Sequence, residues 1–384
     1  MTQHVRLGVV GFGWMGQAHA RALTRVRHHY PDLPVVPELA MVADNAPDSR
    51  LELAKDSYGF AATTADWREL VTSDAVDVVS VTGPNFIHAE VAVAAAQAGK
   101  HLWVEKPAGR GLAETRAIAE AAARAGVHSA VGFNYRNAPA VEHARELVRA
   151  GRIGEVTHAR FQMLGDYAAH PQGAHTWRFT RALSGSGVIG DLGSHGADLA
   201  EYLVGPIVRV MAQDCTFITQ RPASVGAASH FSRGAGGPLE TVENEDYVSM
   251  LVAFESGARG VLEASRASVG EQNAYGFVIH GRTGAIAWDF RRMGELRVCL
   301  DQDYQAAMWS TRLVGPGLAE FGVFQPDAGI AMSYDDLKVI EAKRLLESIV
   351  SGVPTGATLA DAVRAATVAE AAMESITSEG WVKL

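Results

Sequence analysis

Short apolar runs alternate with amphipathic stretches over the first third of the chain. Runs of the length of a buried strand occupy residues 5–10, 38–43, 76–81, 101–104 and 128–133. Helical patterns continue from residue 16 to about residue 26 and cover residues 67–71, 86–98 and 112–125. Asp66 is placed to cap the second of these helices, and Gly99 and Gly126 to end the last two. Strands separated by helices of this length predict a parallel, doubly wound sheet.

Beyond about residue 155 the pattern changes to strands separated by turn residues. The strand candidates are residues 156–164, 207–217, 246–254, 260–267, 275–280, 285–288 and 296–300. They predict an antiparallel meander. A helix at about residues 191–203 interrupts it, residues 220–242 are expected to form a long loop, and helices at residues 335–350 and 359–374 close the chain.

The pattern as a whole is that of an α/β protein with two domains. Residues 1–133 would form the doubly wound domain. Residues 134–384 would form an α+β domain with an open, mainly antiparallel sheet, and the last helices would be able to pack back on the first domain. A length of 384 residues agrees with two domains, since it exceeds what one ordinary core contains.

Composition narrows the class of protein. Hydrophobic residues make up 48% and charged residues 20%, and the net charge is −9 without a run of Lys or Arg, which argues against a nucleic-acid binder. No leader-like or membrane-spanning stretch is evident, so a cytoplasmic enzyme is expected. The only two cysteines, Cys215 and Cys299, lie in apolar strand-like surroundings and are expected in the core, with a single disulfide as the alternative.

A glycine-rich motif follows the first apolar run directly. Its residues are Gly11, Phe12, Gly13, Trp14, Met15 and Gly16, which match G-x-G-x-x-G. The motif is weak alone, but between a strand and a helix it predicts a dinucleotide site in which backbone N–H groups bind the phosphates. The alternative is a plain strand-to-helix turn.

Asp44 ends the second predicted strand, somewhat further along than the usual spacing of about 20 residues after the motif. A carboxylate there can bind the ribose hydroxyls of NAD and would repel the 2′-phosphate of NADP. No arginine follows it immediately, so NAD is favoured over NADP. A solvated aspartate in a turn is the alternative.

Several further motifs resemble the glucose–fructose oxidoreductase / inositol dehydrogenase (Gfo/Idh/MocA) family. They are the fingerprint, Val104-Glu105-Lys106-Pro107, Gly132-Phe133-Asn134-Tyr135-Arg136, Trp177-Arg178-Phe179, Gly185-Ser186-Gly187 and Gly190-Asp191 through Asp198. The resemblance covers essentially the whole chain. It implies a Rossmann domain followed by an open antiparallel sheet whose free face makes homodimers or homotetramers.

The resemblance also implies cofactor contacts beyond the fingerprint. They would come from Gly83, Pro84, Asn85, His88, Glu105 and Lys106. One position departs from the family, because Gly83 stands where its members usually carry threonine. Any contact from residue 83 would therefore be made by the backbone.

Lys106, Asp191 and His195 are the candidate catalytic residues. Lys106 follows the strand at residues 101–104, at the edge where doubly wound sheets bind ligands, and its ammonium could stabilise alkoxide character on a reacting oxygen. The resemblance suggests a cis bond to Pro107. The alternative is a surface lysine.

Asp191 and His195 are spaced i, i+4, so they share one helix face, and Asp198 lies one turn further. His195 is expected to act as the general base in oxidation, with Asp191 binding the substrate hydroxyl. An aspartate favoured by the helix dipole and a core histidine are the alternatives. A metal site formed with Asp198 is conceivable, but no metal is expected.

Substrate contacts follow from the resemblance alone. They would involve Asn134, Tyr135, Arg136, Asp166, Trp177 and Arg178, a set that suits a polyhydroxylated ring. Trp177 could equally belong to the core, and Arg178 could pair with a surface acid.

These residues favour an NAD-dependent dehydrogenase that acts on a secondary hydroxyl of a sugar, anhydrosugar or cyclitol. One alternative is an NAD-cycling lyase or glycosidase that oxidises its sugar only transiently. Another is a non-catalytic NAD-binding sensor, which would not need the complete set of Lys106, Asp191 and His195.

Overall fold

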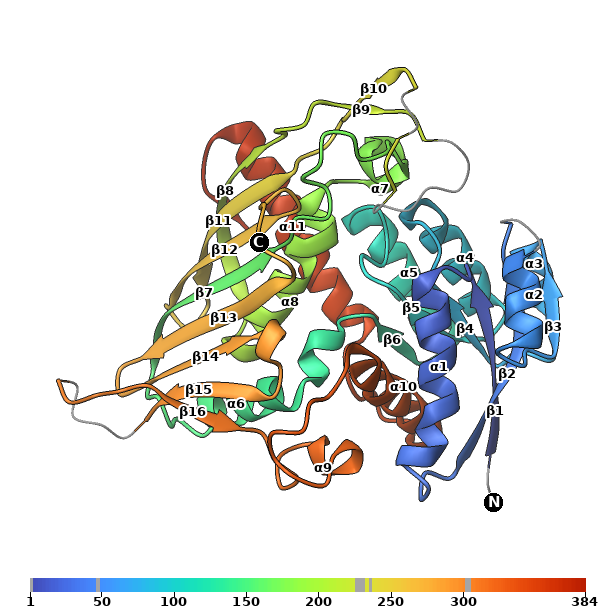
Figure 1. Cartoon of the computed structure of the whole chain (residues 1–384), viewed down its shortest axis with the longest axis horizontal. Helices are drawn as coiled ribbons and strands as arrows, with labels where there is room; N and C mark the ends of the chain where they lie inside the picture. Colours follow the sequence, from blue (N-terminus) through green and yellow to red (C-terminus); the bar gives the residue numbers. More distant parts are fainter. Residues whose placement is uncertain (1–2, 46–48, 225–231, 235–236, 301–304) are drawn as a thin grey trace. The chain divides into compact units, whose positions relative to one another are not determined.

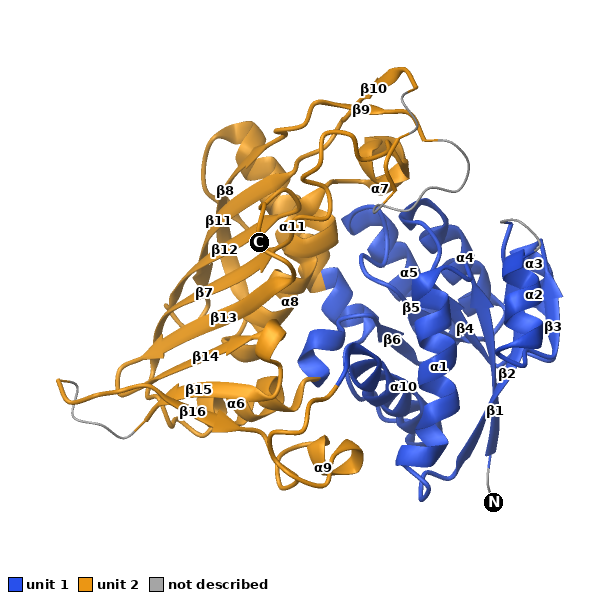
Figure 2. Ribbon diagram, viewed as in Figure 1, with its two compact units in different colours: residues 1–137, 333–363 blue, residues 138–332, 364–384 orange. Residues whose placement is uncertain are grey.

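The computed structural model describes residues 3–45, 49–224, 232–234, 237–300 and 305–384. Two compact units divide the chain (Figure 2). The first unit comprises Met1–Asn137 and Ser333–Val363, and the second comprises Ala138–Met332 and Arg364–Leu384. The functional boundary expected after residue 133 stays a prediction. The segment Ser333–Val363, near the C-terminus, belongs to the first unit.

A parallel sheet is the framework of the first unit (Figure 1). Among the described residues it has six strands in the order β3-β2-β1-β4-β5-β6, and all neighbouring pairs are parallel. The strands are β1 (Gln3–Val10), β2 (Val35–Ala43), β3 (Ala62–Thr64), β4 (Val78–Val81), β5 (His101–Val104) and β6 (Ser129–Val131). The predicted doubly wound sheet is confirmed. In this order ligands bind beyond the carboxyl ends of β1 and β4, where the direction of winding reverses.

Helices connect these strands and cover the sheet. They are α1 (Trp14–His29), α2 (Ser49–Asp56), α3 (Trp67–Thr72), α4 (Asn85–Gln97), α5 (Leu112–Ala125) and the later α10 (Tyr334–Ser351). The cap at Asp66 is confirmed, because its side chain accepts a hydrogen bond from the N–H of Arg68 at 3.0 Å. Gly126 ends α5 in the left-handed conformation, with φ at 66°. α10 packs along α1, and α2 and β3 were not expected from the sequence.

A mixed sheet is the framework of the second unit. Its strands follow the order β16-β15-β14-β13-β7-β12-β11-β8-β17 within the part of the chain that the structure describes. The strands are β7 (Val156–Leu164), β8 (Ile207–Cys215), β11 (Tyr247–Phe254), β12 (Arg259–Ser265), β13 (Ala274–Gly281), β14 (Ala285–Asp289), β15 (Glu295–Cys299), β16 (Ser310–Leu313) and β17 (Val382–Lys383).

The antiparallel meander needs one correction, because β7 and β12 pair in parallel. The early strand β7 inserts between two later strands, β13 and β12, and β13 runs antiparallel to it while β12 does not. The sheet as a whole is mainly antiparallel, as expected.

The helices outside the first unit's sheet are α6 (Pro139–Arg149), α7 (Arg181–Ser184), α8 (Ser194–Leu203), the short α9 (Phe321–Phe324) and α11 (Leu359–Ser378). Of these, α6 and α8 pack on strands of the second unit's sheet, and α11 is hydrogen-bonded to β8. α8 lies so close to β12 that a Cβ atom on Gly196 would be 3.1 Å from the side chain of Leu262. α8 is preceded by a π-helical turn, Ile189–Gly193, where the sequence indicated ordinary helix.

Two local expectations are wrong. Part of the segment expected as a loop at residues 220–242 forms a two-stranded sheet of β9 (Gln220–Pro222) and β10 (Leu239–Thr241); residues 225–231 and 235–236 of it lie outside the described part. Cys215 is exposed and Cys299 is half-buried, and both are free thiols. Each is the last residue of its strand. No helix among the described residues has the length and apolar character needed to cross a membrane.

Candidate functional site

The loop between β1 and α1 uses glycine where a side chain would obstruct the backbone. A Cβ atom on Gly16 would lie 2.2 Å from the carbonyl oxygen of Gly11, so only glycine lets α1 pack this closely on the end of β1. A Cβ atom on Gly13 would meet no heavy atom within 4 Å among the described residues. α1 has neither a side-chain cap nor an acidic residue in its first turn. The first N–H groups of α1 are therefore suited to bind a dinucleotide phosphate.

The other fingerprint side chains differ in their surroundings. Phe12 is fully buried, with its ring edge-on to Tyr58 and Phe60, so this residue can face a ligand only through its backbone. Trp14 is 61% exposed, and its ring lies 5.2 Å from that of Tyr334. The Sδ of Met15 lies 4.0 Å from the hydroxyl of the same tyrosine. The first residue of α10 thus packs against the start of α1.

Gly83 lies close to the fingerprint, because a Cβ atom on Gly11, whose φ is +91°, would lie 2.7 Å from the Cα of Gly83. A Cβ atom on Gly83 itself would lie 2.4 Å from Cδ1 of Ile87, so a side chain at this position requires Ile87 to move. A hydroxyl is present one residue earlier, where Thr82 donates a hydrogen bond to the carbonyl of Gly11 at 2.6 Å. The sequence analysis missed this role of Thr82. Pro84 and Asn85 are the N-cap and the first residue of α4.

Asp44 is buried at the end of β2 and is tied to the fingerprint. Its Oδ2 accepts a hydrogen bond from the N–H of Phe12 at 2.6 Å. The guanidinium of Arg50 on α2 lies 3.5 Å from the same oxygen. The arginine that was not found directly after Asp44 therefore comes from the next helix.

His88 joins the turn after β4 to the segment after β5. One ring nitrogen lies 2.8 Å from the carbonyl oxygen of Gly83, and the other lies 2.9 Å from that of Pro107. Burial lowers the pKa of this imidazole, while the two carbonyls oppose the shift. Because both nitrogens contact backbone, His88 supports the loops that would carry a cofactor. The expected cis bond between Lys106 and Pro107 is present, and Lys106 is half-buried.

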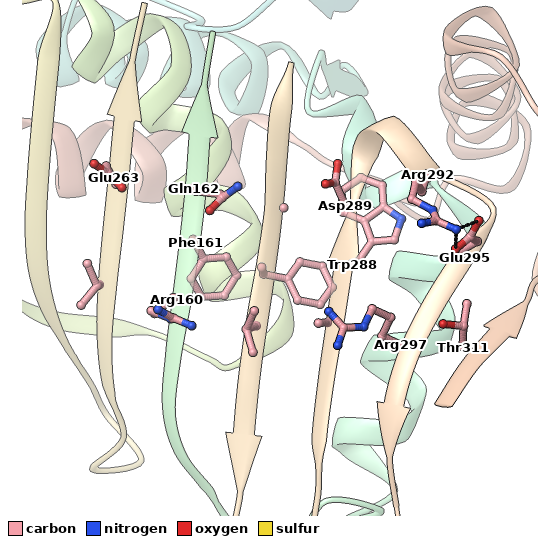
Figure 3. A pocket seen from close by; sticks show the side chains of 15 residues that line it. Arg160, Phe161, Gln162, Glu263, Trp288, Asp289, Arg292, Glu295, Arg297 and Thr311 are labelled. Atoms are coloured by element: carbon pink, nitrogen blue, oxygen red, sulfur yellow. Dashed lines mark hydrogen bonds and ion pairs between the residues drawn. The ribbon is translucent and has the colours of Figure 1, made fainter. Parts of the chain in front are cut away.

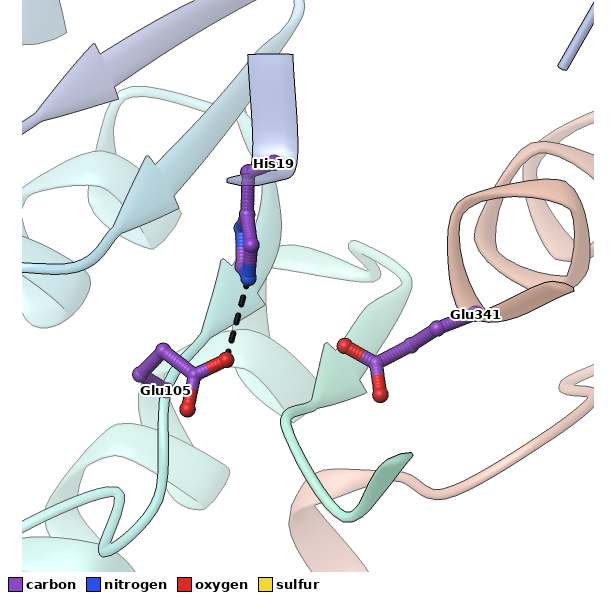
Figure 4. Close-up of side chains that lie close together, drawn as sticks. All are labelled: His19, Glu105 and Glu341. Atoms are coloured by element: carbon purple, nitrogen blue, oxygen red, sulfur yellow. Dashed lines mark hydrogen bonds and ion pairs between the residues drawn. The ribbon is translucent and has the colours of Figure 1, made fainter. Parts of the chain in front are cut away.

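The side chain of Glu105 points into the core, which limits its expected role in cofactor binding to the backbone. Its Oε1 lies 3.0 Å from Nε2 of His19 (Figure 4). The same oxygen lies 2.5 Å from Nζ of Lys338. Its Oε2 accepts a hydrogen bond from the N–H of Lys106 at 3.3 Å. A Cβ atom on Gly132 would lie 2.4 Å from this carboxylate, so glycine at the end of β6 provides the space.

The residues that follow β6 are buried in a 3₁₀ turn, Asn134–Asn137. Asn134 is 1% exposed, and its Nδ2 has no hydrogen-bond partner within the described part of the chain. Tyr135 is 7% exposed. Arg136 forms an ion pair with Asp361 at 3.2 Å, so its guanidinium serves at least partly to fix the start of α11.

Most predicted dinucleotide-side residues thus meet at one edge of the first unit. Gly11 follows β1, Asp44 follows β2, Gly83 follows β4 and Lys106 follows β5. The strands are parallel, so all four lie at the carboxyl edge of the sheet, which is where a doubly wound sheet binds its ligand.

In the second unit, Asp191 lies in the π-helical turn and His195 in the first turn of α8. The N–H groups of Gly187 and Ile189 donate to the buried carboxylate of Glu245 at 2.7 and 2.9 Å. Burial raises the pKa of Glu245, and these hydrogen bonds oppose the shift. His195 is 5% exposed. Single π-turns are frequent at functional sites, and the pattern of the sequence did not indicate one here.

Tyr167 contacts a candidate site residue, and the sequence analysis missed it. Its hydroxyl donates a hydrogen bond to Oδ2 of Asp191 at 2.6 Å. Burial first, and then the charge of Asp191, raises the pKa of Tyr167 well above its usual value. The same two causes raise the pKa of Tyr275. Tyr167 comes directly after Asp166, but nothing in the spacing of the sequence pairs it with Asp191.

The segment that carries Tyr167 is anchored to the sheet. The buried guanidinium of Arg221 donates to the carbonyl oxygens of Ala168 and His170, and the N–H of Ala168 donates to the carbonyl of Arg266 at 2.9 Å. Residues 165–176 are therefore held in place from both sides.

The remaining predicted substrate residues are half-buried. The guanidinium of Arg178 stacks 4.3 Å from the ring centre of Trp177, and the carbonyl of Arg178 accepts a hydrogen bond from Asn244. Asp166 accepts a hydrogen bond from the N–H of Ala169 through its carbonyl oxygen. Trp177 and Arg178 thus form one stacked pair.

Family profiles match both units. Residues 5–133 match the profile described as the oxidoreductase family with an NAD-binding Rossmann fold. Residues 141–287 match that of the GFO/IDH/MocA C-terminal domain.

Individual relatives extend over the whole chain. Levoglucosan dehydrogenase of Pseudarthrobacter phenanthrenivorans is 35% identical over 99% of this chain and 98% of its own length. Myo-inositol 2-dehydrogenase of Thermotoga maritima is 26% identical over 99% of this chain and 98% of its own length. A solved structure of levoglucosan dehydrogenase in complex with NADH and levoglucosan superimposes with a TM-score of 0.92, at 33% identity and 99% coverage of both chains.

Gly13→Ala and Gly16→Ala are expected to separate cofactor binding from stability. Gly13→Ala adds a methyl group where the protein itself leaves space, so the melting temperature should stay close to that of the wild type while the Kd for NADH rises at least tenfold. Gly16→Ala places a methyl group against the carbonyl of Gly11, so it should lower the free energy of unfolding by roughly 1–3 kcal/mol. Fluorescence titration with NADH and thermal unfolding measure the two effects. Unchanged NADH affinity in Gly13→Ala would contradict this assignment of the phosphate site.

Tyr167→Phe is expected to lower kcat/KM roughly tenfold, because a hydrogen bond to a charged group contributes about 1.5–3 kcal/mol. Steady-state kinetics with a sugar that the wild type oxidises provides the measurement. Tyr247→Phe is the matched control, since Tyr247 is a half-exposed residue of β11 in the same unit. Equal kcat/KM values for the two variants would show that the bond to Asp191 does not matter for turnover.

Proposed function

Because the chain belongs to the GFO/IDH/MocA family of NAD-binding oxidoreductases, we propose that it oxidises a secondary hydroxyl of a sugar, anhydrosugar or cyclitol. The observation that carries the proposal is the position of Lys106 at the same carboxyl edge as the glycine fingerprint and Asp44. The names of its relatives agree, since they include dehydrogenases of levoglucosan and of myo-inositol. In this proposal residues 1–133 bind the dinucleotide, and residues 134–384 hold the substrate.

NAD fits the residues of the first unit. The unobstructed backbone at Gly13 and the uncapped start of α1 suit the pyrophosphate, and the carboxylate of Asp44 suits the ribose hydroxyls. A buried carboxylate at this position disfavours the additional phosphate of NADP by like-charge repulsion. When bound, the nicotinamide accepts the two electrons and the hydrogen of the substrate C–H bond.

In the proposed reaction the chain has two catalytic tasks. It removes the proton of the substrate hydroxyl, and it stabilises the negative charge that develops on the oxygen. In the proposal, the ammonium of Lys106 donates a hydrogen bond to the reacting oxygen and stabilises its alkoxide character. The imidazole of His195 accepts the hydroxyl proton, and the carboxylate of Asp191, held by Tyr167, orients the substrate hydroxyl. In the reverse direction His195 returns the proton.

Sugar recognition is assigned to polar and aromatic groups of both units. Asn134, Tyr135, Asp166, Trp177 and Arg178 are proposed to contact the ring and its hydroxyls. The buried Nδ2 of Asn134 supports this, because a buried donor without a partner among the described residues is satisfied when a substrate oxygen binds it. Arg136 is proposed to contribute alongside its ion pair with Asp361.

Lys106→Met is expected to lower kcat by roughly 10²–10³-fold, the usual effect of removing a donor to a developing oxyanion. A panel of sugars, anhydrosugars and inositols with NAD and NADP, followed by NADH or NADPH absorbance, identifies the substrate first. Lys343→Met is the matched control, because Lys343 pairs with Glu347 in an i, i+4 ion pair on α10.

Near-normal turnover of Lys106→Met would contradict the proposed mechanism. Consumption of a sugar without net formation of NADH would instead identify a reaction in which the oxidation is transient.

The outward face of the sheet in the second unit is proposed to bind a second copy of the chain. Leu251 is 49% exposed, and its neighbours across the sheet, Met211 and Val261, are each 37% exposed. Further along the sheet lies a hollow of about 510 Å³ whose lining includes Arg160, Glu263 and Arg297 (Figure 3). A continuous exposed apolar row beside a hollow with polar and charged groups is typical of a surface that associates with a copy of itself.

Leu251→Arg is expected to convert the oligomer to a monomer, because a charge placed in the middle of a buried interface has no partner there. Light scattering coupled to size-exclusion chromatography gives the mass. Val353→Arg, at an apolar residue that is 61% exposed outside this sheet, should leave the mass unchanged. A wild-type protein that is monomeric at micromolar concentration, or an oligomeric Leu251→Arg, would refute the interface.

A further inference from the structure

A buried ionic cluster lies beneath Lys106 in the first unit. The ligand atoms of His19, Glu105 and Glu341 all lie within 4.8 Å of one another, which would suit a cation (Figure 4). The chain itself supplies that cation. The ammonium of Lys338 lies 2.5 Å from Glu105 and 2.9 Å from Glu341, and its side chain is fully buried.

The rest of the cluster fixes these groups in place. The indole of Trp103 donates to Oε1 of Glu341 at 2.7 Å and stacks on the ring of His19 at 3.7 Å. Burial lowers the pKa of His19 to about 4, so the ring is neutral near pH 7. A neutral ring can donate only once, and because Glu105 is an acceptor, Nε2 carries the hydrogen while Nδ1 accepts from the hydroxyl of Ser80.

This cluster connects directly to the segment that carries Lys106. Oε1 of Glu105 binds Lys338 and His19, and Oε2 accepts the N–H of Lys106. The N–H of Glu105 continues the sheet by donating to the carbonyl of Val81 at 2.9 Å. The backbone at residues 105 and 106 is thus held by the sheet on one side and by the buried carboxylate on the other.

We propose that Lys338 is a positioning residue for the reaction: its ammonium holds the Glu105 carboxylate in the orientation that fixes the backbone of Lys106. The inference rests on the proposed role of Lys106 and deepens it. Glu105 makes no step of the reaction itself, and Lys338 acts only through it. α10, which reaches the first unit late in the sequence, therefore contributes to the placement of the catalytic ammonium.

Lys338→Met tests this role, because methionine has similar length but no charge. We expect kcat to fall roughly 10- to 100-fold, as for other displacements of a catalytic group of about 1 Å. The Kd for NADH and the KM for the sugar should stay within threefold of the wild type. Lys343→Met, the same substitution on the same helix, should leave all three values unchanged.

The pH dependence of kcat provides a readout that a purely structural role would not change. The groups that face Glu105 are His19 from α1, His88 from α4, Lys338 and Glu341 from α10, and Lys106 next to it. Burial raises the pKa of Glu105, but the charge of Lys338 and the hydrogen bond from His19 outweigh it, so that the pKa lies below its usual value. Without Lys338 the pKa of Glu105 rises, so its carboxylate takes up a proton as the pH falls. The plot of kcat against pH should then show an additional decrease on the acidic side. Lys343→Met should lack that decrease.

A double-mutant comparison keeps the test decisive if Lys338→Met alone does not fold. Glu105→Gln leaves Lys338 paired with Glu341, and Glu105→Gln combined with Lys338→Met removes both members of the Lys338–Glu105 pair. If Lys338 acts only through Glu105, both should show the same reduced kcat, and neither should show the additional decrease on the acidic side. A further tenfold loss in the double variant, or wild-type kcat in Glu105→Gln, would overturn the proposal.

Folded Lys338→Met with kcat within twofold of the wild type, or with NADH affinity lost by the same factor as kcat, would overturn the inference. The proposed function fails separately, if Lys106→Met retains turnover. An inactive Lys106→Met together with a fully active Lys338→Met would refute the inference about Lys338 and leave the proposed function intact.

Discussion

A carboxylate removed from water has to be neutralised where it lies, and the first unit meets this constraint at Glu105. Its partner Lys338 is 233 positions away, so the pair forms only when α10 has docked against α1 and the sheet. A buried ion pair adds little net stability over an apolar pair, but removing one partner costs about 3–5 kcal/mol. The pair therefore fixes one arrangement of β5, α1 and α10.

The second unit holds its polar groups in the same way. Arg266 pairs with Asp246 at 2.8 Å, and both side chains are buried. The ring of Phe179 lies between the guanidinium groups of Arg221 and Arg266, at 4.3 and 4.6 Å. The guanidinium of Arg221 and the backbone carbonyl of Arg266 both bind Ala168 within residues 165–176, a segment that places Tyr167 on Asp191. Precise placement of candidate catalytic groups in both units thus depends on charges that are buried beside them and take no part in the chemistry.

The sequence predicts whatever is encoded within a few neighbouring residues. The fingerprint, the cap at Asp66, the left-handed Gly126 and most strands belong to this class, because apolar periodicity and turn chemistry are local signals. Pairing between distant segments carries no such signal. The parallel pair of β7 with β12 and the bond from Tyr167 to Asp191 could therefore not be predicted. The inward turn of the Glu105 side chain depends on Lys338, and a tripeptide motif does not contain that residue.

Two glycines show why a motif can be recognised without its reason being known. Gly132 belongs to a motif that resembles the family's and that continues into the predicted substrate residues. The structure gives a different reason for glycine here, because the Glu105 carboxylate occupies the space that a side chain would need. Gly187 approaches the backbone of Glu245 so closely that a Cβ atom would lie 2.2 Å from its carbonyl oxygen, and its N–H binds the carboxylate of the same residue. In both cases the glycine lies against a buried glutamate that holds a segment with a candidate catalytic residue. Gly132 and Gly187 thus contribute to the placement of the candidate residues Lys106 and Asp191.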